Sequence, residues 1–278
     1  MATATQDLEQ TRAGWDSIAT GYDALVTPTH WWIAEEGLRR AGLRRGMRVL
    51  DVAAGSGGLS IPAARMGARV LATDLAPEML RGLEARARRE GLAEVEVRAM
   101  DGHALELDDD TFDMAGSQFG VMLFPDMPLG VREMARVTRP GGRVLVHAYG
   151  DPREVEFLSF FLDAAHAAVP GFQGPPLDPP PLPFQLRDPE RLREVLSDAG
   201  LTEIRVETVP ETLEFESATA MLDWLATSNP IGAMLVGGFD EAQRVDVRDA
   251  LERSLRERAA GDGPAVLTNP VHIGFGTK

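Results

Sequence analysis

The sequence predicts an α/β protein with a doubly wound, mainly parallel sheet of seven strands and a helical insertion before the last strand. Two observations lead to this fold class. Short runs rich in apolar and β-branched residues alternate with amphipathic helical segments between residues 48 and 149, as is typical of parallel sheets covered by helices on both faces. A turn of small residues at 53–58 also joins the first strand to the next helix, and such turns let a ligand approach the backbone closely.

Each element follows from its local pattern. The expected strands are residues 48–52, 69–73, 94–99, 112–118, 143–149, 203–209 and 265–277. The expected helices are residues 59–66, 77–90, 127–137 and 188–201, with further helices before residue 45, interrupted near Pro28, and at 216–260. The turn at 139–142 contains Pro and Gly residues that stop a helix and lead into a strand. Residues 170–184 are too rich in proline for a regular helix, which favours an extended or irregular connection.

Composition narrows the class of protein. The chain has 278 residues, a formal net charge of −15 and no cysteine. An acidic surface disfavours binding to nucleic acid and to anionic membranes. The absence of cysteine excludes disulfides and thiolate chemistry and is compatible with a reducing compartment. No basic-then-apolar leader and no run of membrane-spanning length is found in the sequence, so we expect a cytoplasmic enzyme.

The first strand and its turn indicate a nucleoside-binding crevice. Asp74 ends the second strand, where a carboxylate can accept hydrogen bonds from a ribose diol. The run from Gly55 to Ser60 lacks the third glycine of the dinucleotide fingerprint. Asp51, just before the turn, would repel a pyrophosphate but suits a ligand that carries ammonium or sulfonium charge. These residues favour S-adenosylmethionine over a nicotinamide dinucleotide.

Four segments in order carry a resemblance to a known family. They are LDVAAGSGG at 50–58, LATDLAPEML at 71–80, RAMDGHALEL at 98–107, and the stretch 112–146 with its RPGGRVLV end. Together they resemble class I S-adenosylmethionine-dependent methyltransferases, most closely the group of ubiquinone/menaquinone C-methyltransferases and small-molecule methyltransferases. One departure is that Ala53 stands where this family usually has its first glycine.

The resemblance implies how the chain is organised. It suggests an N-terminal helical cap at 1–45, a Rossmann-like cofactor-binding core at 46–150 and a Pro-rich connection or cap at 151–187. Residues 188–278 would complete the core with a helix and an antiparallel strand pair. The helical insertion at about 216–260 would fold over the carboxyl edge of the sheet as a substrate lid.

The resemblance also implies the cofactor-binding residues. Asp51 would lie near the ammonium group, Asp74 would hold the ribose hydroxyls, and Asp101 would accept from the adenine amino group. Gln118 and Phe119 would lie beside the sulfonium and the acceptor. The remaining positions carried over from the family are Tyr22 over the cofactor, Ala53, Gly55, Ser56 and Gly57 at the first turn, Leu75 and Met79 near the adenine side, and the backbone of Gly102 and His103. No histidine–carboxylate spacing indicates a metal site.

Methyl transfer from a sulfonium requires alignment first and a general base only if the acceptor must lose a proton. His147, near the end of the fifth core strand, and His30, beside Trp31 and Trp32, are the candidate catalytic residues. His147 shares a strand face with Leu145 and Tyr149, so a packed histidine is an equal alternative.

Aromatic residues concentrate in the segments expected around the pocket, which favours an apolar or aromatic small acceptor. The leading hypothesis is therefore methyl transfer to carbon, oxygen or nitrogen of such an acceptor, with S-adenosylhomocysteine as product, by a monomer or homodimer. Two alternatives stay open. One is a nicotinamide-dependent dehydrogenase, and the other is a non-catalytic S-adenosylmethionine-binding protein.

Overall fold

The computed structural model describes residues 2–174 and 181–278, with side chains from residue 8 onward. Its sheet has seven strands in the order β3-β2-β1-β4-β5-β7-β6. The strands are β1 (Arg48–Val52), β2 (Arg69–Asp74), β3 (Val95–Ala99), β4 (Phe112–Gln118), β5 (Thr138–Tyr149), β6 (Thr202–Phe215) and β7 (Ala265–Thr277). Strand β7 runs antiparallel to both β5 and β6, whereas the strands from β3 to β5 pair in parallel. The predicted fold class is confirmed.

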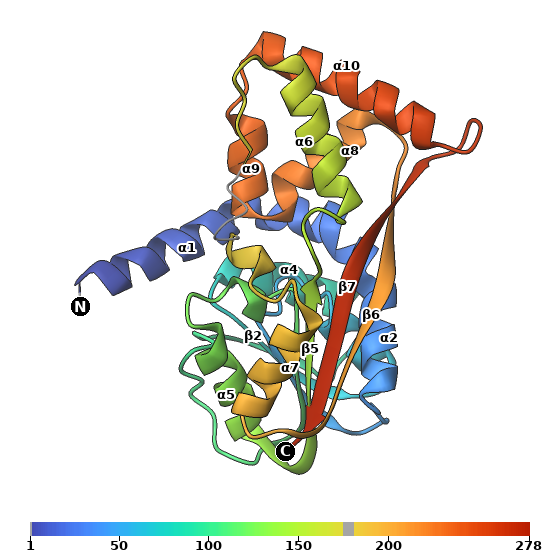
Figure 1. Ribbon diagram of the computed structural model, residues 1–278. Helices are drawn as coiled ribbons and strands as arrows, with labels where there is room; N and C mark the ends of the chain where they lie inside the picture. The colour runs from blue at the N-terminus through green and yellow to red at the C-terminus, as the bar shows by residue number, and fades with distance from the viewer. Residues whose placement is uncertain (1, 175–180) are drawn as a thin grey trace.

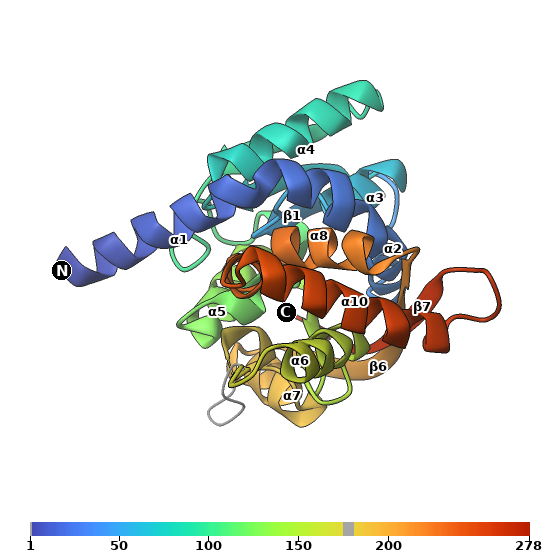
Figure 2. The same ribbon diagram turned by 90° about the horizontal axis from the view of Figure 1, so that it is seen from above.

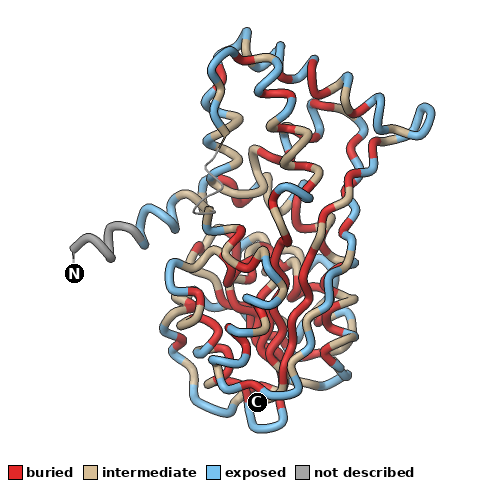
Figure 3. Tube along the Cα trace, in the orientation of Figure 1, coloured by how far each residue is buried: buried red, intermediate tan, exposed pale blue. Residues whose placement is uncertain are grey.

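Helices cover both faces of this sheet. One face carries α2 (Trp31–Arg40), α3 (Ser60–Arg65) and α4 (Pro77–Arg89), and the other carries α5 (Met127–Val137) and α7 (Pro189–Asp198), as the view from above shows (Figure 2). The N-terminal helix α1 (Ala2–Gly21) packs on α4 and continues into two short turns, η1 (Tyr22–Val26) and η2 (Thr27–His30), before α2. Buried residues follow the central strands from end to end (Figure 3).

A second helical layer lies beyond the carboxyl ends of the parallel strands (Figure 1). It comprises α6 (Glu156–Ala168), α8 (Ala218–Ser228), α9 (Pro230–Gly237) and α10 (Glu241–Arg258). Helix α10 packs against α6 and α8, and α8 also contacts η1. Strands β6 and β7 extend from the sheet into this layer (Figure 1).

Three expected segments differ from the structure. Residues 139–142, expected as a separate turn, belong to β5, where the pairing with β4 shifts between Phe112 and Met114. Strand β6 continues to Phe215, well past the expected end at residue 209. The proline-rich segment 170–184 contains a short 3-10 turn, η4 (Leu182–Phe184), and its residues 175–180 lie outside the described residues.

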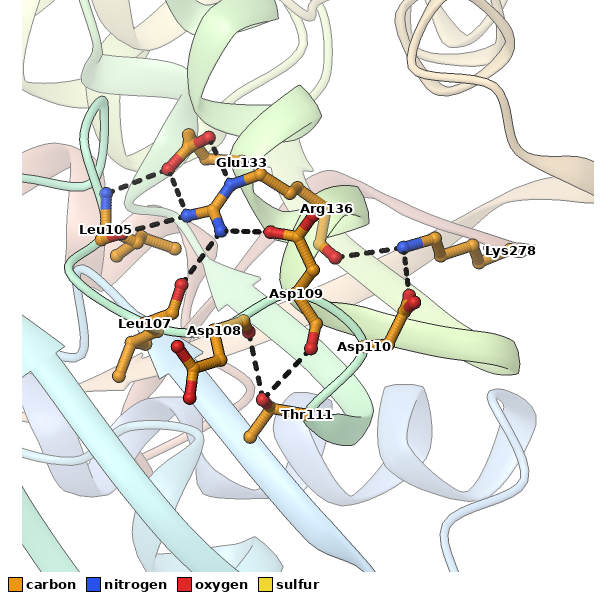
Figure 4. A network of polar contacts seen from close by, with 9 residues as sticks. All are labelled: Leu105, Leu107, Asp108, Asp109, Asp110, Thr111, Glu133, Arg136 and Lys278. Atoms are coloured by element: carbon orange, nitrogen blue, oxygen red, sulfur yellow. Dashed lines mark hydrogen bonds and ion pairs between the residues drawn. The ribbon is translucent and has the colours of Figure 1, made fainter.

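One polar network fixes the loop between β3 and β4, which contains Asp101 (Figure 4). The Arg136 guanidinium donates to the carbonyls of Leu105 and Leu107, and it pairs with Glu133 at 2.8 Å. Glu133 in turn accepts from the Leu105 backbone N–H at 2.9 Å. The loop between β3 and β4 is therefore held by α5 rather than by its own hydrogen bonds alone. In the described part of the chain, no helix is both long and apolar enough to cross a membrane.

Candidate functional site

An apolar cavity of about 350 Å³ lies at the carboxyl edge of the sheet. Loops after β1, β2, β3 and β4 form its floor, and α1 with η1 forms its roof. This is the crevice where open α/β sheets bind their ligands. The predicted cofactor residues that line it are Tyr22, Ala53, Gly55, Asp74, Leu75, Met79, Asp101, Gly102, His103, Gln118 and Phe119. We call it the cofactor cavity.

The turn after β1 brings its backbone close to this cavity. Gly55 takes a left-handed conformation with φ of 54°, and the Tyr22 ring lies over it, 3.4 Å from where a Cβ would stand. Ala53 takes the same left-handed conformation, also with φ of 54°. That conformation costs an alanine about 1 kcal/mol or more, which explains why glycine is usual there. The Ala53 methyl fits because Gly120 opposite has no side chain, and a Cβ on Gly120 would lie 2.6 Å away.

Asp74 organises two loops at once. Its Oδ2 accepts from the Gly55 N–H and its Oδ1 from the Ala76 N–H, each at 2.8 Å. Burial raises the pKa of this carboxyl, while the two backbone donors lower it. Because each carboxylate oxygen has a second lone pair, both can still accept from a ligand in the cavity.

Asp51, Ser56 and Gly57 do not line the cofactor cavity. Asp51 is buried under the turn, where its Oδ2 accepts from Ser60 Oγ at 2.6 Å and its Oδ1 has no hydrogen-bond partner among the described residues. Burial raises the Asp51 pKa to about 7. The Ser56 hydroxyl is fully buried and is paired with Thr27, and Gly57 packs against Leu83. Of the three, only Asp51 keeps an unsatisfied polar atom, which a cationic ligand group could satisfy.

The loop after β3 is held at the cavity wall by its own contacts. Asp101 Oδ1 accepts from the His103 N–H at 2.9 Å and lies 2.8 Å from His103 Nδ1. The His103 ring packs on Phe124, with centroids 4.5 Å apart. Gly102 permits this packing, because a Cβ there would lie 2.5 Å from the Phe124 ring. The carboxylate is thus held at the cavity wall.

The inner wall is made by Gln118 and Phe119 at the end of β4. Gln118 Nε2 donates to the His30 carbonyl at 3.2 Å, and its Oε1 lies 2.9 Å from His147 Nδ1. Phe119 adopts φ of 56°, which is rare for an aromatic residue and often marks a functional position. Its ring stacks on Tyr149 with centroids 4.5 Å apart and an interplanar angle of 12°.

A smaller cavity of about 120 Å³ adjoins the first. Four residues line both cavities: Trp15, Tyr22, Phe119 and Leu123. Its other walls come mainly from η1, η2, η4, α6, α8 and α9 and are mostly apolar, including Phe157, Phe161, Phe184 and Trp224. We call it the inner cavity.

The two candidate catalytic histidines lie in different places. His30 lines the inner cavity and is 5% exposed. His147 lines neither of the two cavities, and its Nε2 is covered by Gly37 of α2, where a Cβ would lie 1.9 Å from it. Burial lowers the pKa of His30 to about 4 and that of His147 to about 3. Only His30 is placed to meet a small molecule.

Three polar residues of the inner region were not singled out from the sequence. Tyr149 lines the inner cavity, and its hydroxyl donates to Glu211 Oε2 at 3.1 Å. Asn269 Nδ2 lies 3.5 Å from the same oxygen. The available signal was that Tyr149 is one of only two tyrosines in the chain, the other being Tyr22. Nothing in the sequence distinguishes Glu211 from the neighbouring glutamates Glu207 and Glu214.

Comparison with known proteins decides the family. A family model described as the ubiE/COQ5 methyltransferase family matches residues 6–169, more than half of the chain. The chain belongs to this methyltransferase family. That membership, together with the strand order, confirms the resemblance carried by the four sequence segments.

Relatives of this ubiE/COQ5 member include an uncharacterised protein of Mycobacterium tuberculosis, 48% identical over 104 residues. That match covers 37% of this chain and only 38% of the relative. The demethylmenaquinone methyltransferase of Mycobacterium bovis is 31% identical over 175 residues, covering 61% of this chain and 71% of the relative. Phosphoethanolamine N-methyltransferase 2 of Haemonchus contortus, solved with S-adenosyl-L-methionine, is similar in fold, with a TM-score of 0.54 and 19% identity over 89% of this chain and 52% of that chain.

Proposed function

We propose that this protein transfers a methyl group from S-adenosylmethionine, bound in the cofactor cavity, to a small apolar acceptor bound in the inner cavity. One observation carries the proposal. The two cavities share the walls formed by Trp15, Tyr22, Phe119 and Leu123, so their contents can meet at one point. In-line displacement needs that juxtaposition above all, because holding donor and acceptor in line supplies much of the rate gain.

The residues of the cofactor cavity fit this methyl donor. When bound, the sulfonium supplies an electrophilic methyl group with a neutral thioether as leaving group. Asp74 would hold the ribose hydroxyls, and Asp101 would accept from the adenine amino group. Asp51 is buried beneath the turn and does not line the cavity, so an ammonium would interact with its carboxyl through water, and a pyrophosphate placed there would lie near a buried carboxylate instead.

The inner cavity suits an acceptor of about one aromatic ring. An engineered cavity of roughly 150 Å³ in another protein takes up benzene, which sets the scale, and the inner cavity is of comparable size at about 120 Å³. Its aromatic walls favour flat apolar molecules. Helices α8 and α9 contribute to its walls, which supports the proposal that the insertion at about 216–260 is a lid that excludes water.

Isothermal titration tests the proposal. S-adenosylhomocysteine should bind to the full chain at one site, and S-adenosylmethionine should bind at the same site. A parallel fluorescence titration with reduced nicotinamide cofactor should give no binding. If the nicotinamide cofactor bound and the adenosyl ligands did not, the protein would be a dehydrogenase of the alternative class. Binding of both adenosyl ligands without transfer of radiolabelled methyl to any member of a panel of phenols, quinols, indoles and amines would favour a non-catalytic binding protein.

A further inference from the structure

Three side chains from distant parts of the chain meet at the wall of the inner cavity, beside Phe119. His30 comes from η2, Tyr149 from the end of β5, and Glu211 from the extended part of β6. His30 Nε2 lies 3.6 Å from Glu211 Oε1 and 3.5 Å from the Tyr149 hydroxyl, and that hydroxyl donates to Glu211 Oε2 at 3.1 Å. We call these residues the polar cluster.

The cluster is layered with respect to the cavity. His30 and Tyr149 line the inner cavity, whereas Glu211 is fully buried behind them. The described polar contacts of the His30 ring nitrogens all involve Nε2, on the side of Glu211 and Tyr149. Nδ1 therefore remains for a cavity ligand. A carboxylate behind one ring nitrogen, with the other nitrogen directed to a ligand, is the arrangement of a general base and its orienting group.

A cluster that served packing alone would be expected to satisfy its polar atoms. Glu211 Oε1 lies in a fully buried site and makes no hydrogen bond with any part of the chain that the structure describes. The surrounding rings are apolar: Phe119 packs on His30 with centroids 4.9 Å apart, and Trp224 lies 6.4 Å away. Placing an ionisable group there costs stability, so the cluster is a candidate for function rather than for packing.

We propose that His30 accepts a hydroxyl proton from the methyl acceptor, with Glu211 and Tyr149 as positioning residues, so that the acceptor is a single-ring phenol. This inference rests on the proposed function. The step balances as follows: the S–CH3 bond breaks with its electron pair going to sulfur, an O–CH3 bond forms, and the phenol proton moves to His30 Nδ1. Glu211 would stabilise the imidazolium that results.

The titration of the cluster gives this proposal a measurable signature. Burial raises the pKa of Glu211 to about 8 and lowers that of His30 to about 4. The titratable groups outside the cluster that are coupled to it are Tyr22, which adds to burial and Glu211 in raising the pKa of Tyr149, and His147, whose pKa is lowered by burial and by His30. Below the pKa of Glu211 its carboxyl is protonated and places no negative charge behind the neutral His30 ring. Above it, the carboxylate lies behind His30 and supports Nδ1 as the acceptor of a phenol proton.

Binding of para-cresol and of toluene to the protein saturated with S-adenosylhomocysteine tests the inference. The two probes share their shape, and only para-cresol has a hydroxyl. We expect para-cresol to bind about tenfold tighter than toluene or better, as a hydrogen bond to a charge-supported base implies. That ratio should grow from about pH 6 to about pH 9, since Glu211 loses its proton in this range.

Two variants separate positioning from packing. Glu211→Gln keeps the side-chain shape and should flatten the pH dependence of the ratio, whereas the exposed Glu214→Gln on the same strand should leave it as in the wild type. Equal binding of para-cresol and toluene by the wild type, or binding of neither, would overturn the inference without touching cofactor binding. A protein that fails to bind S-adenosylhomocysteine fails the proposed function itself. An unchanged pH profile in Glu211→Gln would remove Glu211 from the proposal.

Discussion

Replacing Asp74 by Asn probes the cofactor cavity at the carboxylate that joins two of its loops. The asparagine keeps one carbonyl oxygen, so only one of the two backbone donors, Gly55 or Ala76, retains its 2.8 Å acceptor. The ribose diol would lose its charged acceptor at the same time. Hydrogen bonds to charged groups contribute about 1.5–3 kcal/mol, so we expect a loss of about 2 kcal/mol, or a Kd for S-adenosylhomocysteine raised about thirtyfold.

Isothermal titration at neutral pH measures this Kd, and circular dichroism establishes that the variant is folded. Asp198→Asn is the matched control, because Asp198 is exposed at the end of α7 on the far side of the sheet from the turn. Its affinity should equal that of the wild type. A Kd for Asp74→Asn within about threefold of wild type, less than the value of one ordinary hydrogen bond, would refute the ribose assignment.

Three further predictions concern stability, measured by urea unfolding of the protein without ligand. Ala53→Gly should stabilise the fold by about 0.5 kcal/mol, because it relieves a left-handed alanine; a loss above about 1 kcal/mol would contradict this. Gly37→Ala should destabilise it by about 2 kcal/mol through contact with His147 Nε2, and combining it with His147→Ala should recover part of that loss. Burial raises the Glu211 pKa to about 8, so the folded chain holds a proton that the unfolded chain loses near pH 4.3, and this group's contribution to stability falls as pH rises through that window. Glu211→Gln should remove this fall in the free energy of unfolding, whose slope reaches about 1.4 kcal/mol per pH unit at most. An unchanged slope in the variant would show that Glu211 does not titrate in this pH range.

The strands that carry the cofactor cavity could be predicted closely from the sequence. Residues 48–52 and 112–118 match β1 and β4, and 265–277 matches β7. Central parallel strands are buried on both faces, so they stand out as continuous apolar runs. The residues carried over from the family resemblance then gave most of the lining of the cofactor cavity, because the loops that contain them directly follow these strands.

The inner region could not be predicted in the same way. Strand β6 was expected to end at residue 209, but it continues through Pro210, which lies opposite Pro270 of β7, and the ladder goes on from there to Phe215. Glu211 lies just beyond that proline and was therefore missed. The difference between His30 and His147 also depends on Gly37 of α2, a helix distant in sequence that packs on β5 and covers His147 Nε2. Strand alternation cannot reveal such a contact.

A crystal structure of the complex with S-adenosylhomocysteine tests most directly whether the two cavities hold the methyl donor and the methyl acceptor. We expect the ribose hydroxyls on Asp74, the adenine beside Asp101, and the sulfur at the shared wall formed by Tyr22 and Phe119, facing the inner cavity. A ligand bound with its sulfur turned away from Phe119, or bound outside the cofactor cavity, would contradict the pairing of the two cavities as donor and acceptor sites.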